Sequence, residues 1–203
     1  MTRIIAGSAR GRRLAVPDGR STRPTSDRTR EGLFSALDAA LNGFGGLRVL
    51  DLYAGSGAVG LEALSRGASA ALLVDSDRAA TRVMHANLDT LGLPGASVAS
   101  DRVEHLAAKP CPDEPYDLVY LDPPYAMPAD ELASVLVTLA DNGWIASGAM
   151  IAVERASRGP QWLWPAGFNA LRSRAYGEGT VWYGRRQVSS QHADGAAAKD
   201  RRR

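Results

Sequence analysis

The chain has 203 residues, of which 45% are apolar and 23% charged, a composition typical of one soluble globular domain with an appendage. No apolar run approaches the ~20 residues needed to cross a bilayer, and the N-terminus lacks the apolar segment of a secretory signal, so we expect a cytoplasmic protein. The chain has one cysteine, Cys111, so it cannot form an internal disulfide. The sequence contains no cluster of Cys and His residues that would predict a metal site.

The net charge of +2 conceals a strong asymmetry along the chain. Residues 1–30 contain eight arginines against two aspartates, whereas residues 31–184 contain ten basic against eighteen acidic residues. Residues 185–203 are basic again, with six basic residues against two acidic ones. A basic N-terminal arm on an acidic body predicts that the arm contacts a polyanion while the body has another task.

Two short β-like runs open the chain. Residues 2–7 (TRIIAG) and 12–17 (RRLAVP) are separated by SARG, which predicts a hairpin. A helix follows, because the run Thr-Ser-Asp at 25–27 supplies good N-cap residues and apolar residues then recur at helical spacing up to Leu41.

From residue 47 a pattern of strand, turn and helix repeats. This alternation predicts an α/β fold, a Rossmann-like and mostly parallel sheet with helices on both faces. Two strands over 168–186, joined at GEG, predict an antiparallel hairpin. We divide the chain into an arm (1–22), a main domain (23–186) and a disordered tail (187–203). The other expected strands are 47–53, 70–77, 96–101, 116–125 and 148–154, and the other helices are 58–68, 78–93 and 128–143.

The stretch DLYAGSGAVG contains the pattern G-x-G-x-x-G at Gly55, Gly57 and Gly60, between an expected strand and an expected helix. Asp75 follows about 20 residues after Gly55, as in the dinucleotide-binding fingerprint. The same turn suits the amino-acid end of S-adenosylmethionine (SAM), because both cofactors place a ribose on a carboxylate. The glycines alone therefore leave a dehydrogenase and a methyltransferase open.

Two further features favour SAM. Asp51, at the tip of the preceding strand, would repel a pyrophosphate but suits the cationic amino-acid end of SAM. The sequence Asp122-Pro123-Pro124-Tyr125 follows the fourth strand, at the edge where ligands bind in doubly wound sheets. The Asp122 carboxylate and the Pro123 carbonyl could each accept one N–H of a nucleobase amine and so direct its lone pair toward the donor methyl. The prolines stiffen the turn, Tyr125 offers a stacking surface, and the target base must be extruded or unpaired.

These motifs, VLDLYAGSGAVGLEALSRGA, VDSD and YDLVYLDPPY, resemble those of a class I SAM-dependent methyltransferase. The segments RIIAGSARGRRLAVP and RPTSDRTREGLFSAL narrow the resemblance to the bacterial 16S rRNA (guanine(966)-N(2))-methyltransferase family, over about Thr2 to Arg186. That resemblance implies a seven-stranded sheet whose last strand is antiparallel. It also implies methyl transfer from SAM, without a metal, to a guanine amine of small-subunit rRNA.

The resemblance also implies site residues, carried over by position. The expected guanine-binding and catalytic residues are Asp122, Pro123, Pro124 and Tyr125. The expected SAM-binding residues are Asp51, Gly55, Ser56 and Gly57 at the methionine end, Asp75 and Ser76 at the ribose, and Asp101 and Arg102 at the adenine. Asp77 lies near enough to Asp75 to compete for the ribose. Glu154, at the end of a strand near the same edge, is assigned no role.

The basic arm and the family resemblance together predict the partner, which is 16S rRNA or the small ribosomal subunit. Its arginines would bridge rRNA phosphates with an affinity that falls steeply with salt, and the arm could become ordered on contact with the substrate. We expect a monomer that does not bind membranes. The expected RNA-binding residues are Arg3, Arg10, Arg12, Arg13, Arg20 and Arg23. Arg30, on the first helix, fits a structural role as well as a ligand role.

Three other functions stay open. A DNA adenine-N6 methyltransferase could use the same Asp-Pro-Pro-Tyr turn, but such enzymes usually carry an additional segment that reads bases, for which this chain has little room. An NAD-dependent oxidoreductase would need a proton donor near Asp122, and none is evident. A non-catalytic RNA-binding protein would have no need of the intact Asp122–Tyr125 motif.

Overall fold

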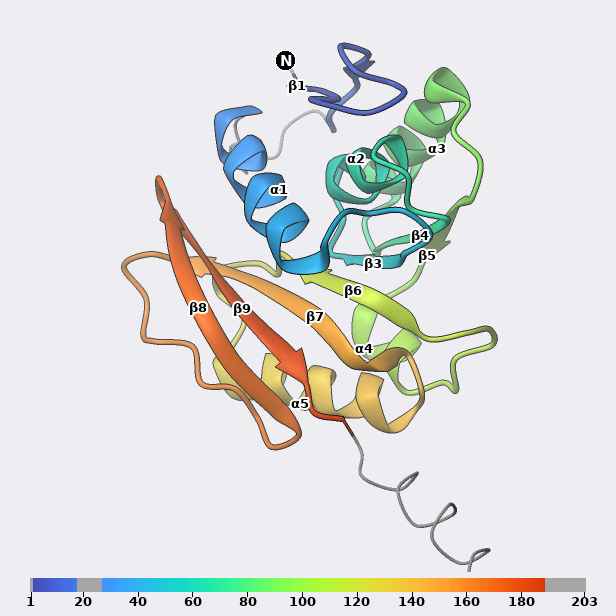
Figure 1. The fold of residues 1–203 in the computed structure, drawn as a ribbon. Helices are drawn as coiled ribbons and strands as arrows, with labels where there is room; N and C mark the ends of the chain where they lie inside the picture. The colour runs from blue at the N-terminus through green and yellow to red at the C-terminus, as the bar shows by residue number, and fades with distance from the viewer. Residues whose placement is uncertain (1, 18–26, 189–203) are drawn as a thin grey trace, which may run out of the picture.

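The computed structural model describes residues 2–17 and 27–188 (Figure 1). A seven-stranded sheet in the order β5-β4-β3-β6-β7-β9-β8 forms its centre. Strands β3 to β7 are parallel, and β9 is antiparallel to both of its neighbours, as the family resemblance implied. The strands are β3 (Arg48–Leu52), β4 (Ala70–Asp75), β5 (Ala96–Ser100), β6 (Tyr116–Leu121), β7 (Ile145–Ala156), β8 (Phe168–Tyr176) and β9 (Gly179–Arg186).

Helices cover both faces of this sheet, which confirms the predicted α/β architecture. On one face lie α1 (Asp27–Leu41), α2 (Ala58–Ser65) and α3 (Arg78–Leu91), and on the other lie α4 (Val103–Ala107) and α5 (Ala129–Asp141) (Figure 1). Two buried apolar clusters follow from this layering. The first cluster lies between α1, α2 and α3 and one face of the sheet, with strand residues such as Leu73 and Met150. The second lies between α4 and α5 and the other face, with strand residues such as Val119 and Ile151. None of the helices in the described ranges is long and apolar enough to cross a membrane.

The arm is folded against the body. Strands β1 (Thr2–Arg3) and β2 (Arg13–Leu14) form the predicted antiparallel hairpin, although each has only two residues. The buried carboxylate of Glu62 on α2 accepts the backbone N–H groups of Ile5 and Ala6, at 2.7 and 2.9 Å. Gly7 has φ of 82° and lies so close to α2 that a Cβ there would be 1.7 Å from the Ser65 carbonyl oxygen. Residues 2–17 therefore pack on α2 as part of the first cluster, with Ile4 and Leu14 buried in it.

Arg30 connects the arm to α1. It is 1% exposed, and its Nη2 donates to the Arg3 carbonyl oxygen at 2.7 Å and to Asp27 Oδ1 at 2.6 Å. Its Nε and Nη1 are buried without a hydrogen-bond partner among the described residues. The observed contacts of Arg30 are thus structural.

The last strands supply positive charge to helix C-termini on both faces of the sheet. Arg185 donates to the Ala40 carbonyl oxygen in the last turn of α1 at 3.1 Å, and Arg186 donates to the Ala140 carbonyl oxygen of α5 at 3.0 Å. Neither helix has a basic residue in its own last turn. The two arginines therefore satisfy orphan carbonyl groups and oppose the helix dipoles from a neighbouring strand.

Most predicted boundaries differ from the observed ones by one to four residues, and three differences have a clear local cause. The strand expected over 116–125 ends at Leu121, because the prolines that follow have no N–H to donate. Strand β7 extends beyond 148–154 at both ends, because Tyr116 of β6 pairs with Ile145 at its start and β9 pairs with it as far as Ala156 at its end. Helix α4 was not predicted, because five residues are too few to show a helical period. The arm boundary at residue 22 and all but residues 187–188 of the expected tail lie outside the described residues.

Candidate active site

The carboxyl ends of β3 and β6 lie side by side at the centre of the sheet. Leu52 pairs with Leu121, and Asp51 pairs with Tyr120. From β3 the chain continues outward to β4 and β5, and it returns to place β6 and β7 on the other side of β3. This is the topological switch point of a doubly wound sheet, where ligands bind beyond the strand ends.

The glycine-rich turn opens on this edge. Gly55 and Gly57 have φ of 57° and 75°, in the left-handed region that favours glycine. A Cβ on Gly55 would meet nothing within 4 Å, whereas one on Gly57 would lie 2.7 Å from the Leu73 side chain. Gly57 is also the N-cap residue of α2. The turn therefore has a packed side at Gly57 and an open side at Gly55, where a ligand could approach the backbone.

Asp51 lies beneath this turn and is 1% exposed. Its Oδ2 accepts the Gly60 N–H at 2.9 Å. Burial raises the pKa of Asp51 to about 7; the Gly60 hydrogen bond opposes this shift and the charge of Asp75 adds to it. A carboxylate held in this way would be stabilised by a cation placed beside it.

Asp75 and Asp77, the two candidates for a ribose, have different surroundings. Asp75 is buried at the end of β4 and accepts the N–H groups of Gly55 and Asp77, both at 2.9 Å. The Asp77 side chain caps α3 by accepting the Ala79 N–H at 2.8 Å. Ser76, between them, is exposed. Asp75 is thus bonded directly to the glycine-rich turn, through the Gly55 N–H.

Asp101 and Arg102 follow β5, at the outer end of the same edge. The Asp101 carboxylate accepts from Lys109 Nζ at 2.7 Å and from the Arg102 N–H at 2.8 Å. The Lys109 hydrogen bond is the main reason that the pKa of Asp101 is lowered. Arg102 is the N-cap residue of α4, and its side chain pairs with Glu104 at 3.2 Å.

The Asp122–Tyr125 turn is fixed from two sides. The Asp122 N–H donates to the Leu52 carbonyl oxygen at 3.3 Å, which ties the turn to the end of β3. Met127 donates its N–H to the Pro124 carbonyl oxygen at 2.9 Å and accepts Arg155 Nη2 on its own carbonyl oxygen at 2.6 Å. Tyr125, by contrast, is 53% exposed. A rigid turn thus presents an accessible aromatic ring beside a largely buried carboxylate.

Two residues beside this turn belong to the site although sequence reasoning gave them no role. Glu154 on β7 is 6% exposed and accepts the Tyr120 hydroxyl at 2.6 Å. Burial, and after it the charges of Glu154 and Asp51, raise the pKa of Asp122 well above its usual range.

The second residue is Tyr53, which follows β3 with φ of 58° and donates its hydroxyl to Glu104 at 3.2 Å. A positive φ at a non-glycine residue is a strained conformation that no sequence signal revealed.

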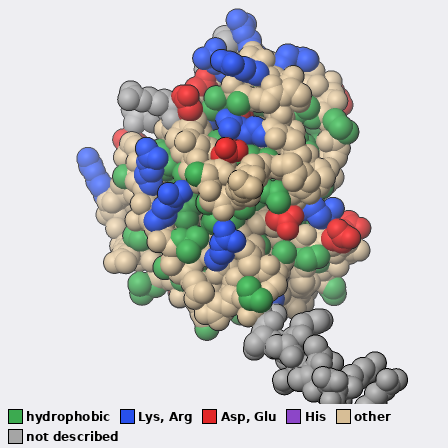
Figure 2. Space-filling view, in the orientation of Figure 1, with side chains coloured by type: hydrophobic (Ala, Val, Ile, Leu, Met, Phe, Trp, Pro, Cys, Tyr) green, Lys and Arg blue, Asp and Glu red, His purple; other side chains and the backbone are tan. Residues whose placement is uncertain are grey.

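The described arginines of the arm fall into two groups. All four are exposed, and basic side chains cover the top of the molecule, where Figure 1 places the arm (Figure 2). Arg3 pairs with Asp27 at 3.2 Å, and Arg12 donates to the Thr90 carbonyl oxygen at the end of α3. Arg10 and Arg13 have no such partner within the described residues. Arg20 and Arg23, also expected to bind RNA, lie outside them.

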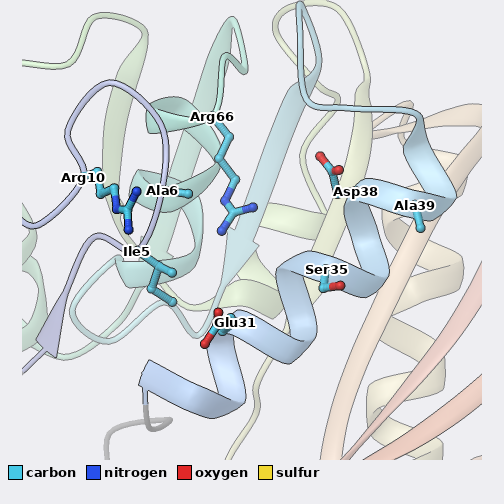
Figure 3. A pocket seen from close by; sticks show the side chains of 8 residues that line it. All are labelled: Ile5, Ala6, Arg10, Glu31, Ser35, Asp38, Ala39 and Arg66. Atoms are coloured by element: carbon cyan, nitrogen blue, oxygen red, sulfur yellow. The ribbon is translucent and has the colours of Figure 1, made fainter.

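A cavity of about 600 Å³ separates the arm from α1. Arg10 of the arm and Arg66, the C-cap residue of α2, face Glu31 and Asp38 of α1 across it (Figure 3). Arg66 also pairs with Glu62 at 2.8 Å, the carboxylate that holds the arm. The lining residues of this cavity include none of the strand-end residues described above.

The structure thus brings Asp51, the glycine-rich turn, Asp75 and the Asp122–Tyr125 turn to one edge of the sheet. This is the arrangement of an α/β methyltransferase, the class of enzyme to which the fold and the site assign the chain. The chain belongs to the family described as Conserved hypothetical protein 95, whose model matches residues 2–185.

Individual relatives agree with this assignment. The chain is 40% identical over 177 residues to ribosomal RNA small subunit methyltransferase D of Escherichia coli, covering 87% of this chain and 85% of that protein. The protein of the same name from Haemophilus influenzae is 34% identical, with 86% and 89% covered. The solved structure of the Escherichia coli methyltransferase yhhF superposes with a TM-score of 0.79 at 36% identity, covering 92% of this chain and 98% of that one.

Proposed function

We propose that this enzyme transfers the methyl group of SAM to the exocyclic N2 amine of a guanine in 16S rRNA, within an assembled or assembling small ribosomal subunit in the cytoplasm. The observation that carries the proposal is the Asp122–Tyr125 turn, tied to the strand end beside the glycine-rich turn. The relatives named for small-subunit rRNA support the substrate.

The residues at the strand ends fit SAM. The buried Asp51 carboxylate, with its pKa raised to about 7, suits the ammonium group of the methionine end. The open side of Gly55 leaves room for that end of the cofactor. Asp75, which is bonded to the glycine-rich turn, would accept the ribose hydroxyls, whereas Asp77 caps α3. Asp101 would accept the adenine amine.

The bound cofactor supplies an activated methyl group on a sulfonium, so the protein needs neither a covalent nucleophile nor a metal. The protein has to hold the amine and exclude water. The Asp122 carboxylate and the Pro123 carbonyl would each accept one N–H of the guanine amine and so direct its lone pair toward the methyl group. Transfer of the methyl group would leave a neutral thioether in place of the sulfonium, and the Asp122 carboxylate would accept the proton that the methylated amine loses. The Tyr125 ring stacks on the extruded base. Because Met127 is held by Arg155, the turn keeps this geometry without further ordering.

The test follows labelled methyl from SAM into unmodified small subunits, stripped 16S rRNA and duplex DNA. We expect N2-methylguanine in the subunit or in the rRNA, and none with the Asp122→Ala variant, which should still bind SAM. N6-methyladenine in DNA would show that the substrate is wrong but the chemistry right. Full activity of Asp122→Ala would overturn the proposed role of the turn and revive a non-catalytic reading of the motif.

A further inference from the structure

Glu154 lies next to Asp122 on the neighbouring strand. Leu121 of β6 pairs with Val153 of β7 in parallel register, so the residues that follow, Asp122 and Glu154, come next to each other. Neighbouring strands are ~4.8 Å apart, which is close enough for two carboxylates to contact one small planar ligand. Burial raises the pKa of the nearby Tyr125, and the charges of Glu154, Asp122 and Glu178 raise it further.

One carboxylate oxygen of Glu154 accepts a hydrogen bond within the described part of the protein, and the other does not. Oε2 accepts the Tyr120 hydroxyl at 2.6 Å; burial raises the pKa of Glu154, and this hydrogen bond opposes that rise. Oε1 has no hydrogen-bond partner within residues 2–17 and 27–188. Gly179 gives Oε1 its space, because a Cβ there would lie only 2.4 Å away. Tyr120 thus orients a nearly buried acceptor whose second oxygen is free for a ligand.

The Watson–Crick edge of guanine presents two adjacent donors, N1–H and the N2 amine. Adenine presents instead an amine beside an unprotonated N1. The lone pair of that N1 would point at a lone pair of the carboxylate, and the two would repel each other. We infer that Glu154, oriented by Tyr120, accepts the guanine N1–H while Asp122 holds the amine, and so selects guanine over other purines. This inference rests on the proposed function and adds a specificity-determining residue to it.

The base 2-aminopurine separates the two contacts, because it keeps the N2 amine but has no hydrogen on N1. Small subunits would be reconstituted with guanine or 2-aminopurine at the modified position, and initial rates of methyl transfer measured at saturating SAM. Wild-type enzyme should prefer guanine by roughly 10- to 100-fold, since 2-aminopurine leaves a buried charged acceptor unpaired. Glu154→Gln should reduce this preference to within about threefold, because the glutamine amide can donate to the bare N1. The missing O6 of 2-aminopurine affects both enzymes alike.

Two more variants complete the test. Tyr120→Phe, which leaves Glu154 in place but frees Oε2, should give an intermediate preference. Glu178→Gln removes an exposed carboxylate that also acts on Tyr125, and it should keep the wild-type preference. Equal rates of wild-type enzyme on the two bases, or an unchanged preference in Glu154→Gln, would overturn the inference and leave the proposed function standing. Absence of N2 methylation on guanine itself would overturn both.

Discussion

The side-chain amide of Asn87 donates to the carbonyl oxygen of Ser56, at 3.0 Å, in the glycine-rich turn. The same amide nitrogen donates to the Ala15 carbonyl oxygen at 3.1 Å, and the amide oxygen accepts the Ala15 N–H at 2.8 Å. Asn87 is 2% exposed. One buried residue of α3 therefore joins the end of the arm to the proposed cofactor loop.

We expect Asn87→Ala to weaken SAM binding and to lower the free energy of unfolding by about 3 kcal/mol, because it leaves buried backbone groups of both segments unpaired. Calorimetric SAM titration and urea unfolding would measure the two effects. His85→Ala, on the exposed face of the same helix, is the control and should change neither. Unaltered SAM affinity in Asn87→Ala would show that the link is structural only.

Asp51→Asn should stabilise the ligand-free protein in a pH-dependent manner. The pKa of Asp51 in the folded state, about 7, lies above the ordinary value of 3.8, so ionisation opposes folding as the pH rises between these values. The variant's advantage should be absent below about pH 4 and reach at most about 4 kcal/mol above pH 7, since one pKa unit corresponds to about 1.4 kcal/mol. Urea unfolding at pH 4, 6 and 8 tests this, and an advantage independent of pH would contradict it. The same variant should bind SAM more weakly.

Methyl transfer should increase with pH as Asp122 ionises. In the proposed mechanism Asp122 accepts the amine N–H as a carboxylate, and burial together with the charges of Glu154 and Asp51 raises the pKa of Asp122. Glu154→Gln removes one of these charges, so the acidic limb of its single-turnover rate should move to lower pH, whatever its effect on the maximal rate. Tyr120 and Tyr125 also face Asp122 but stay neutral in this range. An unmoved limb would mean that the two carboxylates act independently.

Salt dependence should separate the arginines of the arm. Arg10→Gln and Arg13→Gln should each reduce the slope of log affinity for rRNA against log salt by up to about 1, if each residue neutralises one phosphate. Arg12→Gln should affect stability more than this slope, because Arg12 is bonded to the Thr90 carbonyl oxygen. Filter binding between 50 and 200 mM salt provides the slopes. Equal effects of all three substitutions would argue that the arm binds RNA in another conformation.

Arg185→Ala should lower the free energy of unfolding by about 1–2 kcal/mol through loss of its contact with the C-terminus of α1. The rate of methyl transfer by the remaining folded protein should not change. Arg158→Ala, an exposed arginine beyond the other end of the β7–β9 pair, should leave stability within about 0.5 kcal/mol. A loss of activity at full stability would place Arg185 in substrate binding instead.

The sequence predicted those features of the fold that depend on residues close together in the chain. Apolar strand cores, a glycine at the end of α3 and two prolines after β6 were sufficient to predict the sheet and the position of the Asp122–Tyr125 turn. Glu154 could not be assigned, because its partner Tyr120 is 34 residues away and only the register of β6 on β7 brings them together. Asn87 reaches Ala15 and Ser56 across 72 and 31 residues, and nothing near Asn87 in the chain signals either contact.

The contacts of α1 also have a consequence for the order in which the chain can fold during synthesis. Arg172 and Arg185 reach the Ala36 and Ala40 carbonyl oxygens across 136 and 145 residues, and Tyr176 reaches the Gly32 carbonyl oxygen across 144. The Ala40 carbonyl group, in the last turn of α1, therefore gains its arginine partner only after the last hairpin has formed, and the Gly32 and Ala36 carbonyl groups then gain a second one. Such contacts raise the contact order. A nascent chain that lacks the final strands should therefore remain sensitive to proteases at its N-terminal end, and this sensitivity should disappear once β8 and β9 have formed and contact α1.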